Sequence, residues 1–156
     1  MIKKFELDLS SKITFLGIEL FRIKALISFG DVEKGDFGGY VQKEENLSHF
    51  GNAWVYGNAK VYDNAWVYDN ARVYGNAKVS GNARVSKLND YIVFKNNWSS
   101  GRYFTYTRSN KMWSVGCFYG TGGELVKKAY QDSEDSGKHY EAYVNLVKTL
   151  EALDEN

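Results

Sequence analysis

The residue types that most often do chemistry are scarce in this chain of 156 residues. Its two histidines are His49 and His139, and its single cysteine is Cys117. A histidine acts as a general base when it is positioned against a substrate hydroxyl or amine. Neither histidine has a recognisable carboxylate partner nearby in the sequence, so we predict no catalytic residue and keep His49 as the one candidate. Cys117 has apolar neighbours, Val115 and Phe118, which predicts an inert buried thiol.

Cofactor and metal sites have little support in the sequence. Gly120, Gly122 and Gly123 precede a predicted helix, and a helix N-terminus can bind phosphate. No Lys-Ser/Thr pair follows these glycines, as it does in a phosphate-binding loop. The His, Cys, Asp and Glu residues match no metal-ligand spacing. We therefore expect no cofactor and no metal ion.

Macromolecular binding is better indicated, by basic and aromatic residues in the middle of the chain. Residues 51–113 carry nine Lys/Arg against three Asp/Glu, whereas residues 114–156 carry four against eight. Trp, Tyr and Arg are the usual anchors of tight protein interfaces, and rings beside guanidinium groups also suit stacked bases. The predicted binding surface consists of Trp54, Tyr56, Tyr62, Trp66, Tyr68, Arg72, Tyr74, Arg84, Arg102, Arg108 and Lys111.

The element that must position these residues is an uninterrupted repeat at 51–86. It reads GNAWVY, GNAKVY, DNAWVY, DNARVY, GNAKVS, GNARVS. A period of six fits neither an α-helix nor a flat strand. Gly or Asp followed by Asn is typical of tight corners, while the Ala and Val of each hexapeptide lie on one side of an extended segment. The pattern predicts a three-sided prism with eighteen residues per coil and with Val and Ala inward.

The repeat resembles the hexapeptide-repeat family, whose fold is a left-handed parallel β-helix. The resemblance is close at 51–86 and loose at 39–50, where Asn46 falls in the Asn position and His49 in the inward Val position. It implies a fold more than a function, because many members are acyltransferases and others are not enzymes. The enzymes use a histidine as general base, which is why His49 is the catalytic candidate.

Residues eighteen apart should stack on one face of the prism. Trp54 is then expected beneath Arg72 and Trp66 beneath Arg84, in cation–π contact. The aromatic members of the predicted binding surface should point away from the narrow interior, and exposed patches of this kind mark interfaces. The alternative is that the terminal segments fold back and cover these rings.

The segments on either side of the repeat should close its ends. Residues 1–38 are predicted to form an N-terminal β cap, with strands at 3–9, 12–16 and 17–29. Residues 39–86 form the β-helix. Residues 87–156 should contain a three-stranded antiparallel meander at 91–95, 102–108 and 111–118, followed by two helices.

The predicted fold class is therefore mainly β with C-terminal helices (α+β). Thr121 and Glu124 form a predicted capping box at the start of the first helix, which runs to about residue 131. The last helix is expected at 138–153, with Tyr140, Tyr143, Val144, Val147 and Leu150 facing the core.

Most of the chain also resembles small hexapeptide-repeat proteins encoded by bacteriophages and prophages. The resemblance is carried by RIKAL at 22–26, GDFGGYVQKEENLSHFGNAWVYGNA at 35–59 and WSVGCFYGTGGELVKKA at 113–129. Members mostly lack an assigned activity. The resemblance implies a phage or bacterial source, and small phage proteins often bind host machinery, including defence systems such as CRISPR nucleases.

Two function classes remain open. The first is a non-catalytic protein-interaction module, a phage or prophage accessory protein that modulates a host factor and is an anti-CRISPR candidate. The second is a hexapeptide-repeat acyltransferase with an acyl-CoA donor. The enzymes of the family build the donor site between coils of a trimer, with a longer prism and a projecting loop. This repeat has under three coils and no inserted loop, which favours binding.

The expected partner is a host protein, including one that itself handles nucleic acid; the alternative is direct binding of nucleic acid. The exposed aromatics also predict a homo-oligomer, a dimer or trimer. The sequence shows no basic-then-apolar leader and no apolar run of transmembrane length, so we expect no membrane association. Together with the single cysteine, this predicts a cytoplasmic protein of a bacterial cell.

Overall fold

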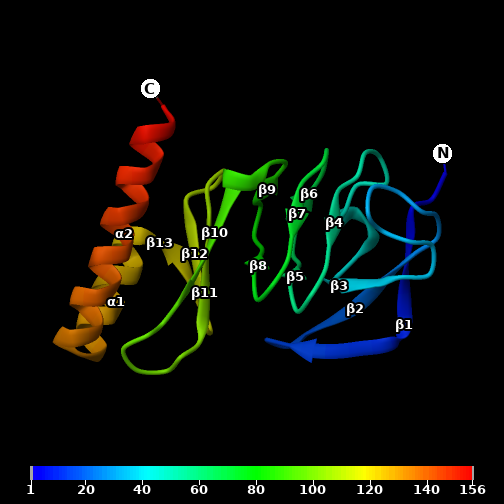
Figure 1. Ribbon diagram of the computed structural model, residues 1–156. Helices are drawn as coiled ribbons and strands as arrows, with labels where there is room; N and C mark the ends of the chain where they lie inside the picture. Colours follow the sequence, from blue (N-terminus) through cyan, green and yellow to red (C-terminus); the bar gives the residue numbers. More distant parts are fainter. Residues whose placement is uncertain (1, 156) are drawn as a thin grey trace.

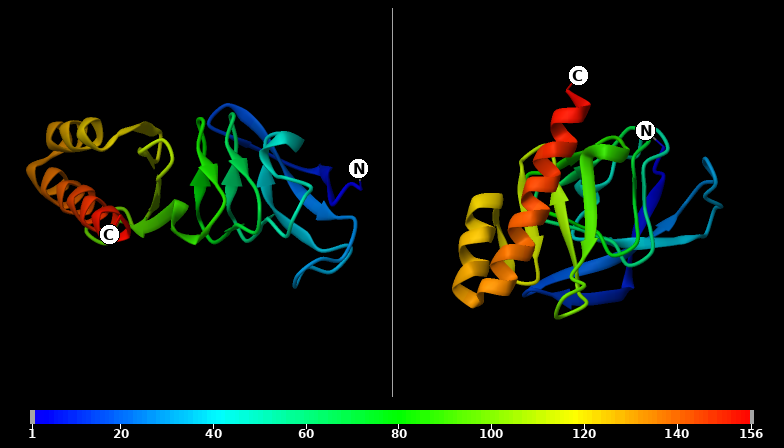
Figure 2. Two further views of the ribbon diagram at one scale, coloured as in Figure 1. Left: turned by 90° about the horizontal axis from the view of Figure 1, so that it is seen from above. Right: turned by 60° about the vertical axis from the view of Figure 1, so that its left-hand side comes forward.

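The computed structural model describes residues 2–155, and the molecule is an elongated α+β structure (Figure 1). An N-terminal sheet lies at one end, six short strands follow, and a second sheet with two helices lies at the other end (Figure 1 and Figure 2). The elements are β1 (Phe5–Phe15), β2 (Ile18–Ala25), β3 (Phe37–Val41), η1 (Glu44–Asn46), β4 (Trp54–Val55), β5 (Lys60–Val61), β6 (Trp66–Val67), β7 (Arg72–Val73), β8 (Lys78–Val79), β9 (Arg84–Val85), η2 (Leu88–Asp90), β10 (Tyr91–Lys95), β11 (Tyr103–Thr107), β12 (Met112–Val115), β13 (Phe118–Thr121), α1 (Gly122–Asp132) and α2 (Glu134–Asp154).

Each two-residue strand of the repeat pairs in parallel with the strand three places later. β4 pairs with β7, β5 with β8 and β6 with β9, which confirms the eighteen-residue spacing. The first residue of every hexapeptide has a φ between 57° and 69°, the left-handed conformation that Gly and Asp tolerate. The repeat valines and alanines are at most 2% exposed, so they fill the interior as predicted.

The alignment of residues 39–50 with the hexapeptide pattern is wrong by two residues. Val41 pairs with Val61 and Leu47 with Val67, so each lies twenty rather than eighteen residues before its partner. The two extra residues fall between Leu47 and β4. Leu47 therefore occupies the inward position predicted for His49, since an apolar side chain can be buried there without a hydrogen-bond partner.

The N-terminal segment extends one face of the repeat into a larger sheet. Its order is β1-β2-β3-β5-β8, with β3 and β5 parallel and the first two pairs antiparallel. The strands predicted at 3–9 and 12–16 are one strand, β1, with an irregularity between Asp8 and Lys12. This sheet spans the predicted boundary after residue 38; the divisions after residues 38 and 86 stay predictions.

The C-terminal sheet has four antiparallel strands in the order β10-β11-β12-β13, one more than predicted. Gly116, at a φ of 56°, turns the chain so that Val115 pairs with Phe118. Cys117 lies in this turn and is exposed, so the prediction of a buried thiol is wrong.

Both helices pack on this second sheet and begin at a capping residue. Thr121 Oγ1 accepts a hydrogen bond from the Glu124 N–H at 3.2 Å, and Glu124 Oε1 accepts one from the Thr121 N–H at 2.9 Å, which confirms the capping box. α2 begins four residues earlier than predicted because Ser133 Oγ accepts a hydrogen bond from the Ser136 N–H at 3.0 Å.

A second apolar core lies between this sheet and the helices. Trp113 and Phe104 of the sheet pack with Val144 and Val147 of α2. Leu150, which was predicted to share this core, is 36% exposed, so that part of the prediction is wrong. No helix within residues 2–155 is long and apolar enough to span a membrane.

Candidate binding surfaces

Two residues of the predicted binding surface are buried, which corrects the prediction that they point into solvent. Trp54 is 3% exposed and Tyr62 is 6% exposed. The N-terminal segment covers both rings: Phe29 packs edge-on against Trp54 at 5.3 Å between centroids, and Phe15 packs against Tyr62 at 5.6 Å. For these two rings the fold-back alternative holds.

Arg72, Tyr56 and Tyr74 form a second group. The Tyr56 and Tyr74 rings stack at 5.0 Å, as predicted from their eighteen-residue spacing. The Arg72 guanidinium lies over Tyr56 rather than Trp54, and it forms an ion pair with Asp31. The hydrogen bond that the Arg72 guanidinium donates to the Asp31 carboxylate raises the pKa of Arg72 and lowers the pKa of Asp31. The charge of Arg72 is therefore already paired within the molecule.

Two of the three basic residues predicted on the meander are neutralised by α2. Arg108 Nη1 lies 2.6 Å from Asp154 Oδ2, and Lys111 Nζ lies 3.2 Å from Glu151 Oε2. The Tyr106 hydroxyl also donates to Glu151, at 2.9 Å. The acidic end of the chain thus offsets part of the positive charge that the sequence places in its middle.

Trp66, Tyr68 and Arg84 remain as an accessible group on the face formed by β6 and β9. The Trp66 and Tyr68 rings stack at 4.0 Å with an interplanar angle of 14°. The Arg84 guanidinium lies 5.6 Å from the centre of the Trp66 ring, as predicted. Trp66 is 36% exposed, and Arg84 is exposed and forms no ion pair within residues 2–155.

Phe50 adds an apolar side chain next to this group and was absent from the predicted surface. It is 71% exposed and lies in the corner that holds the two extra residues. That corner packs on the corner following Tyr68, because the Ala53 N–H donates to the Asp69 carbonyl at 3.0 Å. The sequence signal for Phe50 was the break in the hexapeptide pattern before residue 51. We call Phe50, Trp66, Tyr68 and Arg84 the aromatic face.

His49 has both ring nitrogens engaged. Nδ1 accepts a hydrogen bond from the Lys4 N–H at 3.0 Å, so Nε2 carries the proton and donates to Glu44 Oε1 at 2.8 Å. The ring stacks on Phe5 at 4.3 Å between centroids. Burial alone would raise the pKa of Glu44, but its bonds from His49 and Lys3 hold that pKa below its usual value. His49 therefore joins β1 to the repeat and has no free lone pair for a substrate proton.

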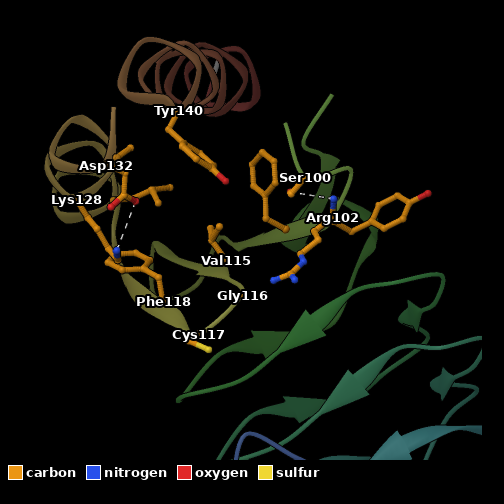
Figure 3. Close-up of a pocket in the computed structure, with 13 residues that line it drawn as sticks. Ser100, Arg102, Val115, Gly116, Cys117, Phe118, Lys128, Asp132 and Tyr140 are labelled. Atoms are coloured by element: carbon orange, nitrogen blue, oxygen red, sulfur yellow. Dashed lines mark hydrogen bonds and ion pairs between the residues drawn. The ribbon is translucent and has the colours of Figure 1, made fainter. Parts of the chain in front are cut away.

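The remaining predicted residue, Arg102, lines a pocket of about 310 Å³ between the second sheet and the helices (Figure 3). Its walls are mostly apolar, with Phe104, Val115 and Phe118 among them. The Tyr140 side chain enters from α2, and Arg102 lies in the segment just before β11 (Figure 3). Cys117 lies at the edge of the pocket, close enough to Lys78 for an electrostatic interaction, and no histidine is among the lining residues.

His139 packs against an aromatic ring, and the acidic side chains form no metal-binding cluster within the described residues. The His139 ring stacks on Trp98 at 4.5 Å, and its Nδ1 hydrogen-bonds to the Asp135 carbonyl at 2.7 Å. Within residues 2–155, no three His, Cys, Asp or Glu side chains lie close enough to hold a metal ion. Comparison with protein-family models and with curated proteins finds no match for this chain.

Proposed function

We propose that this protein is a non-catalytic interaction module that binds a protein partner through the aromatic face. We also propose that residues 39–86 form a short left-handed parallel β-helix that presents this face. The parallel pairs eighteen residues apart and the left-handed corners support the β-helix. An experimental structure that resolves the order in which the chain passes through the three faces would test the left-handedness of the β-helix.

The observation that carries the proposed function is the exposed stack of Arg84, Trp66 and Tyr68. The rings are already ordered by their contacts with one another, so a partner loses little side-chain entropy when it covers them. Trp, Tyr and Arg anchors of this kind contribute most of the binding energy of protein interfaces. Phe50 enlarges the apolar area beside them.

The proposed partner is a host protein of a bacterial cell. This part rests on the resemblance of residues 22–26, 35–59 and 113–129 to phage and prophage hexapeptide-repeat proteins. Under this proposal the chain is a phage accessory protein that modulates a host factor, with a CRISPR nuclease as one candidate. The acyltransferase alternative is not favoured, since its general base would be His49, whose ring nitrogens are both occupied.

The test is capture from bacterial lysate with tagged wild type and with the double variant Trp66→Ala, Arg84→Ala, followed by quantitative mass spectrometry. Both side chains point outward, so the double variant should melt within a few degrees of wild type. A protein enriched by the wild type should fall at least about tenfold in the double variant, since each anchor contributes about 1 kcal/mol or more.

The matched control is Lys127→Ala with Lys148→Ala, which changes two exposed side chains on the helices. It should retain the enriched protein at the wild-type level. If the Trp66/Arg84 variant enriches the same proteins as strongly as wild type, the aromatic face is not the interface and the proposed function is wrong.

A further inference from the structure

A second surface combines charge and rings on the outward side of the N-terminal sheet. Arg22, Tyr40, Lys60 and Lys78 occupy opposed positions on β2, β3, β5 and β8, so they form one row across four strands. Neighbouring strands lie about 5 Å apart, so this row places its side chains within reach of one another. The eighteen-residue spacing predicts that Lys60 and Lys78 stack, but it does not predict the strands beside them.

Cations and aromatic rings alternate without a gap along this surface. Lys24 and Arg22 lie 5.7 and 6.0 Å from the Phe37 ring, and Arg22 lies 5.6 Å from Tyr40. Lys60 lies 5.9 Å from Tyr40 and 5.2 Å from Phe15, and the Phe15 ring also has Lys78 at 5.4 Å. We call these seven side chains the cation–ring ladder: Lys24, Phe37, Arg22, Tyr40, Lys60, Phe15 and Lys78.

The positive charge of the ladder has no counter-charge at its repeat end. Within residues 2–155, none of its four cations forms an ion pair, and neither does Arg102, which lies beyond Lys78. Burial lowers the pKa of Lys60 and of Lys78, and the nearby charges of Lys60 and Arg102 lower the Lys78 pKa further. An anion placed among these three cations would relieve their mutual repulsion.

The opposite end of the ladder is less positive. On β1, Asp8 lies opposite Arg22 and Glu6 lies opposite Lys24. These carboxylates would repel an anion at that end. The anion-binding part of the surface is therefore Lys60, Lys78 and Arg102; the Tyr40 ring lies beside it, and the Phe37 ring follows beyond Arg22.

We propose that this surface binds single-stranded nucleic acid, with phosphates on Lys60, Lys78 and Arg102 and bases against Tyr40 and Phe37. Phe37 is 50% exposed and Tyr40 is half-buried, so both rings can be reached. The negative face of an aromatic ring repels carboxylates but stacks with neutral bases, which favours nucleic acid over an acidic protein. The site is separate from the aromatic face and does not depend on the proposed function.

The test is fluorescence anisotropy of a labelled oligothymidylate titrated with the full chain over a range of salt concentrations. Each phosphate contact on a single strand contributes a slope of about −0.7 to log K against log salt, so three contacts predict about −2. The double variant Lys60→Gln, Lys78→Gln should retain one contact and a slope of about −0.7. Glutamine keeps part of each aliphatic stem, and Arg102→Gln, at an exposed site, should independently reduce the slope to about −1.4.

Further variants separate stacking from charge. Tyr40→Leu should weaken binding roughly fivefold or more, without changing the salt slope, because it removes a stacking ring and no cation. Lys127→Gln with Lys148→Gln removes the same charge from the helices and should leave both affinity and slope unchanged. The Trp66/Arg84 double variant should also bind the oligonucleotide like wild type, so that a failed capture experiment does not bear on this site.

Three results would overturn the proposal. The first is no binding by the wild type at low salt. The second is an unchanged slope in both the Lys60/Lys78 variant and the Arg102 variant. The third is polyglutamate competing as well as unlabelled oligothymidylate of equal charge, which would assign the surface to an acidic protein instead.

Discussion

Each corner of the repeat depends on one residue in the left-handed conformation. Glycine occupies four of the six corners and aspartate the other two, at Asp63 and Asp69. A side chain costs about 1–2 kcal/mol in this conformation. The local surroundings then decide whether a Cβ at the position costs more. Gly75 has open space around it, whereas a Cβ at Gly51 would lie 2.4 Å from the Asp69 carbonyl oxygen of the next layer.

We therefore expect unequal effects from two alanine substitutions. Gly75→Ala should lower the free energy of unfolding by about 1–2 kcal/mol, through backbone strain alone. Gly51→Ala should lower it by more, because the layers must also separate. Urea unfolding followed by circular dichroism measures both. Equal losses would show that the corner at Gly51 does not contact the corner at Asp69 in the next layer.

Residues inside the repeat were easier to predict than their surroundings. The period of six placed the valines and alanines inward because that rule depends only on neighbours within one hexapeptide. The burial of Trp54 and Tyr62 depends instead on Phe29 and Phe15, which are distant in sequence. No local pattern reports such a contact. Glu44, by contrast, is only five residues before His49, so the prediction that His49 has no nearby carboxylate partner is wrong.

Among the elements, α1 shows how a short motif defines a boundary. Thr121 caps the helix, and the backbone hydrogen bond from Thr121 lowers the pKa of the Glu124 carboxyl. A carboxyl with a folded pKa below its unfolded value stabilises the protein above the unfolded pKa, about 4.3. That stabilisation is lost as the pH falls through the folded pKa.

The variant Glu124→Gln tests this linkage. Glutamine can make the same capping hydrogen bonds but carries no charge toward the helix N-terminus. The wild type should melt at a higher temperature than the variant at pH 7, and the difference should vanish as the pH approaches 3. Thermal melts at both pH values measure this. A difference that persists at low pH would mean that the charge of Glu124 is not its source.

The predicted boundaries of strands and helices were wrong where a single residue changed the direction of the backbone. The segment 111–118 has the alternation of a single strand, but Gly116 turns it into β12 and β13. Ser133 looked like part of a longer break, yet it caps α2 directly. The two extra residues before β4 shift the frame, and the sequence shows only a break in the hexapeptide pattern there. In each case the outcome depends on hydrogen bonds that a pattern of residue types does not specify.

Across the whole molecule, folding brings together charged side chains that are far apart in the sequence. The basic meander meets the acidic end of the chain through Arg108 and Asp154, so the opposite charges of the two segments partly cancel. On the N-terminal sheet and the aromatic face, Lys60, Lys78 and Arg84 form no ion pair within residues 2–155. Arg84 belongs to the aromatic face, and Lys60 and Lys78 belong to the cation–ring ladder.

The exposed rings also bear on assembly. We predict a homo-oligomer, a dimer or a trimer, because exposed rings outside the aromatic face, such as Tyr74 and Tyr103, are an apolar area that a second copy can cover. Light scattering at micromolar concentration should give two or three times the 17.8 kDa mass of the chain. A single 17.8 kDa species would contradict this prediction.

Photo-cross-linking tests the central claim, that the aromatic face contacts a protein partner, most directly. A photoreactive phenylalanine derivative replaces Trp66 in one sample and Lys127 in another, and each chain is expressed and irradiated in bacterial cells. Position 66 should form an adduct heavier than the chain by the mass of a different protein, and position 127 should form none. An adduct at 66 with a second copy of the chain alone, or equal adducts at both positions, would contradict the claim.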